Sequence, residues 1–309
     1  MKLDDVSRYM EEAGIPGRDA YDLPSSNKRF PDGASYRIEL SGIEGPEVLE
    51  ALIDERHKRN VPVHRLISFC QGGTLFDRQE LRDFAQMAAE DKMEVIAIPG
   101  PRSAWDIGRQ FTSSEGMRSG GMHHRGSDEL RKVIADMMRM YDVGMRGFML
   151  VDRGLLWLVK KMQDQGNFPN DVTIKMSVWT GVSSAAGARL MEALGASSFN
   201  PVADLTLPQL ASMRKVVNIP IDFYIYVFES FGGINRFYDA AEVARLCSPC
   251  YFKFEPAPSA GGFYTPWSSD EQHIALVRKK VKWAGIVRDF VRDNYPEIKV
   301  SEQGPKDLY

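Results

Sequence analysis

Residues 172–180 read VTIKMSVWT, a stretch in which apolar and polar side chains alternate. Successive side chains of a β-strand point to opposite faces. The apolar side chains from Val172 to Val178 therefore share one face, and Lys175 lies on the other, polar face. The same alternation recurs in segments 37–41, 222–226 and 251–255. Strands of this kind predict a sheet with an apolar outer face and a polar interior able to carry chemistry.

Strand and helix patterns alternate eight times from residue 34 onward, over about 260 residues, which is the size of a (β/α)8 TIM barrel. The expected strands are 36–41, 65–71, 93–98, 147–152, 172–180, 198–202, 221–228 and 251–255. A helical pattern follows each of them, and the last helix runs from about 268 to 294. This order predicts parallel strands joined by right-handed crossovers.

An open, doubly wound sheet is the rival architecture, and it often carries a glycine-rich motif in its first turn. The turn at 41–46 reads SGIEGP and lacks that motif. The sequence therefore favours a single barrel domain over residues 34–309. Residues 1–33 precede it as an N-terminal extension, with a short amphipathic helix at about 4–13 and a connector rich in Pro, Gly, Ser and Asn.

Composition excludes several classes of protein. The chain has 309 residues, a net charge of −3 and 43% hydrophobic residues, so no basic surface for nucleic acid is expected. No apolar run approaches the roughly 18 residues of a membrane helix, and the N-terminus lacks an apolar signal core. A cytoplasmic protein with a small-molecule substrate is expected, without nucleic-acid or membrane partners. The sequence is compatible with a homo-oligomer as well as with a monomer.

The three cysteines are too few for a disulfide scaffold. Cys247 and Cys250 have the spacing of a metal or redox pair, but no second ligand pair accompanies them. Cys250 also falls on the apolar face of its strand. We interpret both residues as structural.

The active site of such a barrel lies at the carboxyl ends of its strands. Alternation sorts the side chains, and those expected to face inward are Arg37, Glu39, Ser41, Ser68, Cys70, Asp152, Lys175, Ser177, Trp179, Asn200, Asp222, Tyr224, Tyr226, Lys253 and Glu255. Residues early in a strand, such as Arg37 and Asp222, are expected to form a structural salt-bridge network, because buried charges need partners. Residues late in a strand are expected to contact substrate.

The predicted catalytic residues are Lys175, Glu39, Asp152, Glu255 and Lys253. The predicted substrate-binding residues are Arg102, Ser177, Trp179, Tyr226, Asn200, His123, His124 and Glu229. Crowded by a second cation, Lys175 would form a Schiff base. Surrounded by carboxylates, it would stay an ammonium ion that holds a substrate anion. The inward acids favour the second role. The same carboxylates leave a divalent metal as an alternative, with the ion unknown.

The connection at 100–127 is long, and a long loop at this end of a barrel is often a lid. Its arginines indicate an anionic substrate, and His123 and His124 are candidates for acid–base work on closure. Glycine-rich loops follow the seventh strand at 229–233 and the eighth at 256–264. Loops in these two places bind phosphate in many barrels, so phosphate or carboxylate capture is a further hypothesis.

Residues from about 172 to 232 resemble the collagenase-like peptidase family. The stretch 175–228 reads KMSVWTGVSSAAGARLMEALGASSFNPVADLTLPQLASMRKVVNIPIDFYIYVF. The resemblance implies a barrel, and some relatives modify RNA or cofactors. The family continues with a Gly-x-x-Cys segment and further cysteines, whereas this chain has FESFGG at 228–233. An iron–sulfur cluster is therefore not expected. No nucleophile–histidine–acid order and no HExxH motif supports peptidase chemistry.

The leading hypothesis is an enzyme that acts on a small, polar, anionic substrate by acid–base chemistry or hydrolysis at the C-terminal mouth of the barrel. Lys175 and Arg102 would orient the substrate, and Glu39, Asp152 or Glu255 would carry protons. The alternatives are a Schiff-base lyase using Lys175 or Lys253, a hydrolase of the collagenase-like peptidase family, and a non-catalytic binding or assembly barrel.

Overall fold

Eight parallel strands close into a barrel in the computed structural model, which describes residues 2–70, 72–100, 123–229, 233–258 and 270–308. The strands pair in the order β6-β5-β4-β3-β2-β1-β9-β7, and pairing of β6 with β7 closes the ring. Their bounds are β1 Tyr36–Ile43, β2 Arg65–Ser68, β3 Glu94–Ala97, β4 Gly147–Leu150, β5 Thr173–Met176, β6 Ser198–Phe199, β7 Ile221–Val227 and β9 Cys250–Phe254. A two-residue strand, β8 (Ile234–Asn235), pairs antiparallel with β7 outside the ring. The predicted (β/α)8 fold is confirmed.

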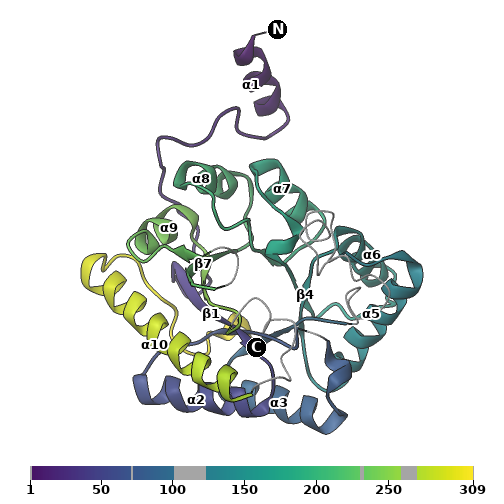
Figure 1. Ribbon diagram of the computed structural model, residues 1–309. Coiled ribbons are helices and arrows are strands. Elements are labelled where there is room, and N and C mark those ends of the chain that lie inside the picture. The colour runs from purple at the N-terminus through teal and green to yellow at the C-terminus, as the bar shows by residue number, and fades with distance from the viewer. Residues whose placement is uncertain (1, 71, 101–122, 230–232, 259–269, 309) are drawn as a thin grey trace.

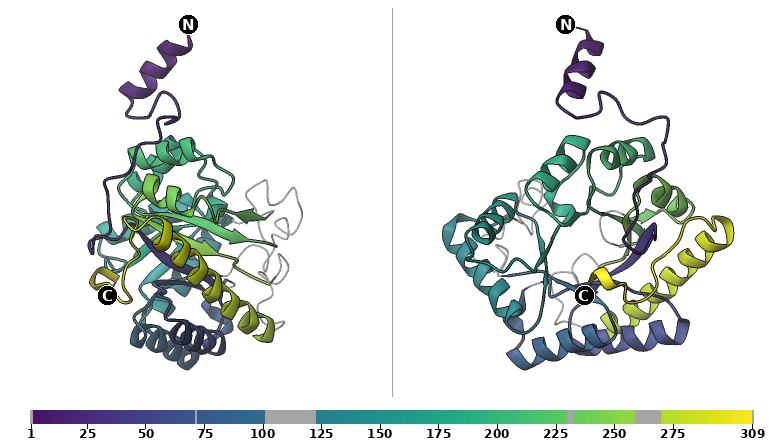
Figure 2. Two further views of the ribbon diagram at one scale, coloured as in Figure 1. Left: turned by 90° about the vertical axis from the view of Figure 1, so that its left-hand side faces the viewer. Right: turned by 180° about the vertical axis from the view of Figure 1, so that it is seen from behind.

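Helices surround the strands on all sides (Figures 1 and 2). They are α2 Pro46–Arg59, α3 Arg78–Glu90, α5 Gly126–Tyr141, α6 Arg153–Asp164, α7 Ala185–Ala193, α8 Leu207–Val216, α9 Ala240–Cys247 and α10 Asp270–Asn294. Two of the helices begin with a capping box, α3 with Asp77 and Glu80 and α8 with Thr206 and Gln209. Each box satisfies N–H groups that the first helical turn leaves unpaired. The N-terminal extension contains α1 (Leu3–Glu12).

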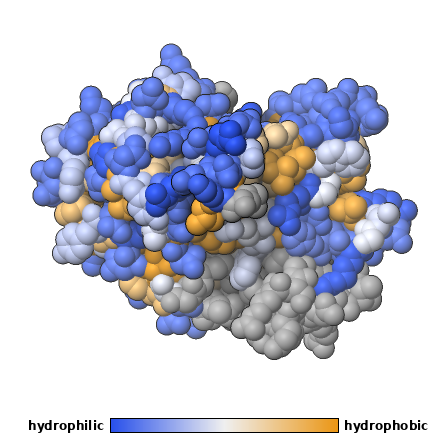
Figure 3. Space-filling model, turned by 90° about the horizontal axis from the view of Figure 1, so that it is seen from above, coloured by the Kyte–Doolittle hydropathy of each residue, from blue (hydrophilic) through white to orange (hydrophobic). Residues whose placement is uncertain are grey.

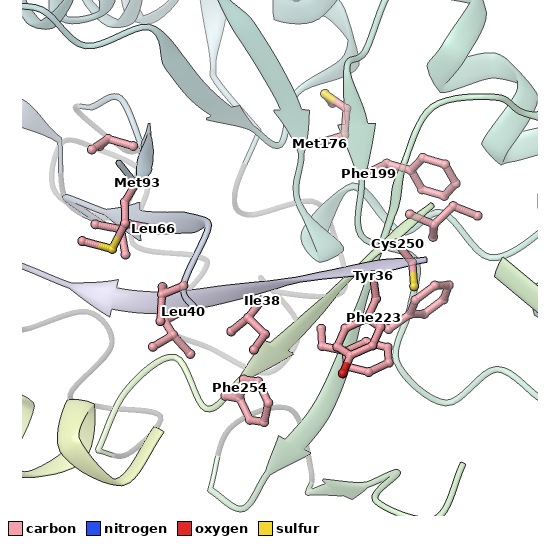
Figure 4. Packing of buried hydrophobic residues seen from close by; sticks show 14 of the residues in the cluster. Tyr36, Ile38, Leu40, Leu66, Met93, Met176, Phe199, Phe223, Cys250 and Phe254 are labelled. Atoms are coloured by element: carbon pink, nitrogen blue, oxygen red, sulfur yellow. The ribbon is translucent and has the colours of Figure 1, made fainter. Parts of the chain in front are cut away.

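The main hydrophobic core lies between the strands and the helices. Ile38, Leu40 and Phe254 belong to it, and Figure 4 shows several of its members on neighbouring strands. Cys247 and Cys250 are free thiols buried in the same core, and burial raises the pKa of Cys247 to about 12. The face seen in Figure 3 is mostly hydrophilic. Among the described residues, no helix has both the length and the apolar character to cross a membrane.

The amino ends of the strands are closed by the chain's own termini. Arg37 points to this end, where its guanidinium donates to Asp307 at 2.7 and 2.9 Å and to Ser301 Oγ at 2.9 Å. Its guanidinium also stacks 4.0 Å from the ring centre of Phe30. Arg37 thus has the structural role expected of a charge early in its strand.

Fully buried His64 ties the same end together. Its Nδ1 accepts from the N–H of Ile38 at 2.9 Å, so Nε2 carries the proton and faces the carbonyls of Ser301 and Glu302. Protonation of Nδ1 would break the first of these bonds. Burial, assisted by the nearby charge of Arg37, lowers the pKa of His64 to about 4.

Stability should therefore fall as pH falls from 6.5 towards 4. The unfolded chain binds a proton at His64 in this window and the folded chain does not, which costs roughly 3 kcal/mol. His64→Gln should lose correspondingly less stability than the wild type between pH 7 and pH 4, as measured by urea unfolding at both values. The matched control is Lys58→Gln on the exposed side of α2, which should follow the wild type. Parallel pH profiles for all three proteins would contradict this role of His64.

Candidate active site

A buried cluster of charges fills the middle of the barrel. Lys175 of β5 extends its ammonium group to Glu39 of β1, with Nζ at 2.6 and 2.7 Å from the two carboxylate oxygens. The same Nζ lies 2.8 Å from Oδ2 of Asp222 on β7. All three side chains are fully buried. Barrel closure therefore brings together three strands that are far apart in the sequence.

Arg65 of β2 forms the layer next to this cluster. Its Nη1 lies 3.8 Å from Glu39 and 3.7 Å from Asp222 and donates to Ser198 Oγ at 3.1 Å, while its Nε donates to Glu94 at 2.6 Å. The guanidinium stacks 3.8 Å from the ring centre of Tyr251. The pKa of Arg65 is raised, because these acidic neighbours outweigh the effect of burial.

Arg65 was not among the residues predicted to face inward, because the alternation expected for β2 had Ser68 pointing inward and Arg65 pointing outward. Ser68 does not face the interior: it is in register with Ile43 and Ala97, which pack in the outer core. Cys70 does face inward, because Phe69 between them adopts a positive φ of 58° and shifts the alternation by one residue. A charge at the first residue of a strand was the available signal for Arg65.

Lys253 of β9 stands beside Glu39 with fewer partners than Lys175. Its Nζ lies 3.3 Å from Glu39 Oε1 and 5.1 Å from the ring centre of Tyr224. An ammonium group has three N–H donors, and among the described residues Glu39 is the one carboxylate that Lys253 contacts.

The cluster shifts the protonation of its members in different directions. Burial alone would raise the pKa of Glu39, but Lys175, Lys253 and Arg65 outweigh it and hold that pKa below its usual range. Burial lowers the pKa of Lys175 despite its two carboxylate partners. Burial and the negative charge of Glu39 raise the pKa of Asp222, against the opposing effect of Lys175. Glu39 is therefore ionised at neutral pH and is able to accept a proton.

The interior has an apolar side as well. Inward side chains of β2, β3 and β4 and of the residues just after them form a separate buried cluster of Ile67, Cys70, Ile96, Ile98 and Met149. Met149 is directly in register with Lys175. The barrel interior thus contains an apolar cluster next to the charged one.

Glu255, immediately after β9, binds backbone rather than Lys175. Its Oε2 accepts from the N–H groups of Phe228 at 2.5 Å and Glu229 at 2.9 Å. Phosphate or carboxylate capture was predicted for the loop that begins at Glu229. In the structure, the N–H groups at the start of this loop bind the carboxylate of Glu255. Glu229 takes part through its backbone. Residues 230–232 and 259–264 of the two glycine-rich loops lie outside the described residues.

Asp152 caps α6 and holds both predicted histidines. Its Oδ1 accepts from the N–H groups of Gly154 and Leu155, and its Oδ2 accepts from the N–H of His124 at 3.1 Å and lies 3.5 Å from Nδ1 of His123. Burial opposes ionisation, but these bonds hold the pKa of Asp152 well below its usual range. Of the acids that were expected beside Lys175, Glu39 contacts it directly. The second carboxylate that contacts Lys175 is Asp222, which was predicted to belong to the structural salt-bridge network.

Ser177 and Trp179 lie beyond the end of β5. The strand ends at Met176, and residues 178–180 form a short 3-10 turn, η3, with Ser177 as its N-cap. The strand predicted over 172–180 is therefore too long, because the hydroxyl of Ser177 accepts from the N–H of Trp179 and stabilises a turn instead. Ser177 remains near the mouth of the barrel and is buried.

Tyr226 faces outward, contrary to the prediction. A β-bulge between Tyr224 and Tyr226 changes the register of β7 against β9 and inverts the alternation. Tyr226 consequently stacks on Phe228 at 5.6 Å and packs against Trp283 of α10. It does not line the interior.

Asn200, just after β6, is buried beside the charged cluster. Its Nδ2 donates to the carbonyl of Asp222 at 2.9 Å. Its Oδ1 has no hydrogen-bond partner within the described part of the chain.

Arg102 and most of the predicted lid, residues 101–122, lie outside the described residues. The carboxylates considered for a metal do not converge: Glu39 contacts lysines, Asp152 caps α6 and Glu255 binds backbone. In the described ranges, no group of three His, Cys, Asp or Glu side chains is arranged to hold an ion. The chemistry proposed below therefore includes no step through a metal.

Lys280 of α10 reaches the seam between β1 and β9 next to this site. Its fully buried Nζ donates to the carbonyls of Ser41 and Pro256. Burial, only partly offset by Glu44 and Glu255, lowers the pKa of Lys280 to about 7. The outer helix thereby fixes the ends of the two strands that carry Glu39 and Lys253.

No protein-family model matches the chain, and the search of curated proteins found no match either. Several solved structures are similar at low identity. The YdjI aldolase from Escherichia coli K12 aligns over 85% of this chain and 91% of its own, with 14% identity and a TM-score of 0.46. The U32 peptidase Mk0906 aligns over 74% and 96%, with 13% identity and a TM-score of 0.43. D-Psicose 3-epimerase from Clostridium cellulolyticum H10 aligns over 82% and 98%, with 8% identity and a TM-score of 0.45.

These likenesses are distant and concern the barrel fold alone. The U32 peptidase is one of these distant structural matches, and no protein-family model supports the resemblance of residues 172–232 to collagenase-like peptidases. Aldolase, epimerase and peptidase activities belong to those proteins. A TIM barrel hosts many chemistries, so the function of this chain has to be argued from its own site.

Proposed function

We propose that this protein is an enzyme that acts on a small, polar, anionic substrate by acid–base chemistry at the C-terminal mouth of the barrel. Lys253 binds the negative charge of the substrate, or the oxyanion that develops on it, and Glu39 accepts the proton. The observation that carries the proposal is the difference between the two central lysines. Lys175 is held by two carboxylates, whereas Lys253 contacts one carboxylate oxygen at 3.3 Å among the described residues.

The roles follow from this difference. Lys175 donates to both oxygens of Glu39 and so fixes the plane of that carboxylate, which makes Lys175 a positioning residue. Glu39 stays ionised because three cations surround it, so its carboxylate is in the form that accepts a proton, and its lowered pKa requires that Lys253 activate the substrate as an acid. A cation held in a buried site stabilises developing negative charge more strongly than it does in water. The apolar cluster that contains Met149, which is in register with Lys175, would contact the carbon skeleton of a small acid.

Lys253→Met tests the proposal. We expect turnover to fall about 100-fold or more, the usual cost of removing one group that stabilises an oxyanion. Turnover would be followed by NMR on a panel of 2-keto, 2-hydroxy and phosphorylated sugar acids. Binding would be followed through the rise in melting temperature with pyruvate, oxalate and phosphate as probes, since a ligand at 100 times its Kd stabilises by about 2.7 kcal/mol.

The matched control is Lys282→Met on the exposed side of α10, which should keep both turnover and the ligand-induced shift. Wild-type turnover in Lys253→Met would overturn the role of Lys253. Turnover lost in the control as well would point to a loss of fold.

A Schiff-base lyase is the second candidate, and the same observation favours Lys253 over Lys175 as its nucleophile. The ammonium of Lys175 would have to leave three carboxylate oxygens before it could attack a carbonyl, and Lys253 would have to leave one. Borohydride reduction in the presence of the keto acids should then give a mass adduct on the peptide that contains Lys253. Turnover of a keto acid without any adduct would exclude this candidate and leave the acid–base proposal standing.

A further inference from the structure

Helix α1 presents an apolar stripe that its own barrel does not cover. Leu3, Val6 and Met10 are spaced three and four residues apart and share one face. No residue of α1 is buried, and Leu3 is 86% exposed. Figures 1 and 2 show the helix projecting beyond α8, away from the barrel. An isolated helix of ten residues is marginal in water, so α1 needs a surface to pack on.

The connector to α1 is anchored, so the helix is presented as an arm. The N–H of Ala20 donates to Ser212 Oγ of α8 at 2.8 Å, and the N–H of Ser26 donates to the carbonyl of Arg245 of α9 at 2.8 Å. Residues 13–19 are left as the tether. Fully extended, a tether of this length spans roughly 23 Å.

A surface of suitable character lies beside α10. Six aromatic side chains from β7 and the residue after it, from the segment before α9 and from α10 contact one another there, and we call them the aromatic surface: Tyr226, Phe228, Phe237, Tyr238, Trp283 and Phe290. Phe228 is 54% exposed and Tyr238 is 78% exposed. A contiguous exposed apolar patch of this kind commonly marks an interaction site.

We infer that α1 of one copy of this chain packs its apolar stripe on the aromatic surface of a second copy, and that the exchange is reciprocal. The opposite charges of α1 and α10 favour this pairing. Four carboxylates on α1, at residues 4, 5, 11 and 12, outnumber the cations Lys2 and Arg8. α10 exposes Arg278, Lys279 and Lys282 beside Trp283 and has no acid between residues 272 and 288. Two α1 helices would repel each other, whereas α1 and α10 attract.

The contact made by each arm is small. A ten-residue helix is about 15 Å long and about 10 Å wide, so one docked arm covers roughly 150 Å² of its partner. Two reciprocal arms then bury roughly 600 Å² in total over both partners, below the range of about 1,200–2,000 Å² that stable interfaces bury, so a weak, concentration-dependent dimer is expected. A C2 dimer is also the commonest closed assembly of identical chains.

The test is the mass of the full-length protein by size-exclusion chromatography with light scattering, over a hundredfold range of concentration. The wild type should form a dimer as its concentration rises. Leu3→Asp on the arm and Tyr238→Asp on the aromatic surface should each weaken dimerisation at least tenfold. Both residues are exposed, so the barrel should keep its melting temperature. Trp157→Asp, which changes a 53% exposed aromatic residue on α6, is the matched control and should leave the dimer intact.

A charge exchange separates this contact from other interfaces. Lys279→Glu with Lys282→Glu should weaken the dimer, and adding Asp4→Lys with Glu11→Lys should restore it. A wild type that is monomeric at every concentration would overturn the inference. So would a dimer that survives both Leu3→Asp and Tyr238→Asp, because it would have to use another surface. Both experiments measure the oligomeric state and neither measures catalytic activity, so their result is independent of the proposed function.

Discussion

Lys175→Met is expected to lower the free energy of unfolding by about 3–5 kcal/mol at pH 7, the usual cost of removing one partner from a buried ion pair. The ammonium of Lys175 lies within 2.8 Å of both Glu39 and Asp222. Without it, two fully buried carboxylates face each other across the barrel. Urea unfolding followed by circular dichroism would measure the loss.

The loss should shrink as pH falls towards 4. In the variant, burial and mutual repulsion raise the folded-state pKa of Glu39 and Asp222 above the unfolded values. The variant therefore regains stability as these carboxylates take up protons and loses it as pH rises. Lys161→Met on the exposed side of α6 removes a surface ion pair with Asp164 and should cost about 0–1 kcal/mol. Equal losses in the two variants would contradict the central role of Lys175.

Gly42→Ala is expected to damage the seam between β1 and β9. Gly42 has φ +73°, and a Cβ added there would lie 1.7 Å from the carbonyl oxygen of Pro256. The backbone of one strand end has to move, and Lys280, whose Nζ lies 3.2 Å from that Cβ, has to move with it. We expect a loss of several kcal/mol in stability, because overpacking of about 1–3 kcal/mol adds to the conformational strain. Turnover should fall too, since the seam positions Glu39 and Lys253.

Gly33→Ala is the matched control for this prediction. Gly33 also has a positive φ, +84°, but nothing lies within 4 Å of an added Cβ. It should lose only the conformational part, about 1–2 kcal/mol, and keep turnover. Equal unfolding midpoints for the two variants would show that the contact with Pro256 is relaxed at little cost.

The fold was predictable because its signals are local. Eight alternations of strand and helix and the inward parity of Glu39, Lys175 and Lys253 follow from periods of two and 3.6 residues. The predictions were wrong where the alternation of a strand is interrupted. A bulge turns Tyr226 outward, the positive φ of Phe69 shifts the parity of β2, and a turn ends the strand before Trp179.

The site was predictable only as a set of inward charges. Sequence placed Lys175 among several acids, but it could not select Asp222 over Asp152 and Glu255. Asp152 and Glu255 are engaged by N–H groups close by at the strand ends, whereas Asp222 lies in the same layer as Lys175. That layer is set by the stagger of the strands around the barrel, which no single segment contains.

The sequence by itself determined that this chain alternates strands with helices, and that a lysine and several acids point into the space that the strands enclose. These properties reside in the spacing of neighbouring residues, and each segment carries them alone. Only the tertiary structure decided that Glu39, Lys175 and Asp222 meet, that Arg65 joins them, and that Lys253 has Glu39 as its one charged contact among the described residues. Such contacts depend on strand order, register and closure, because residues more than a hundred positions apart become neighbours only when the ring is complete.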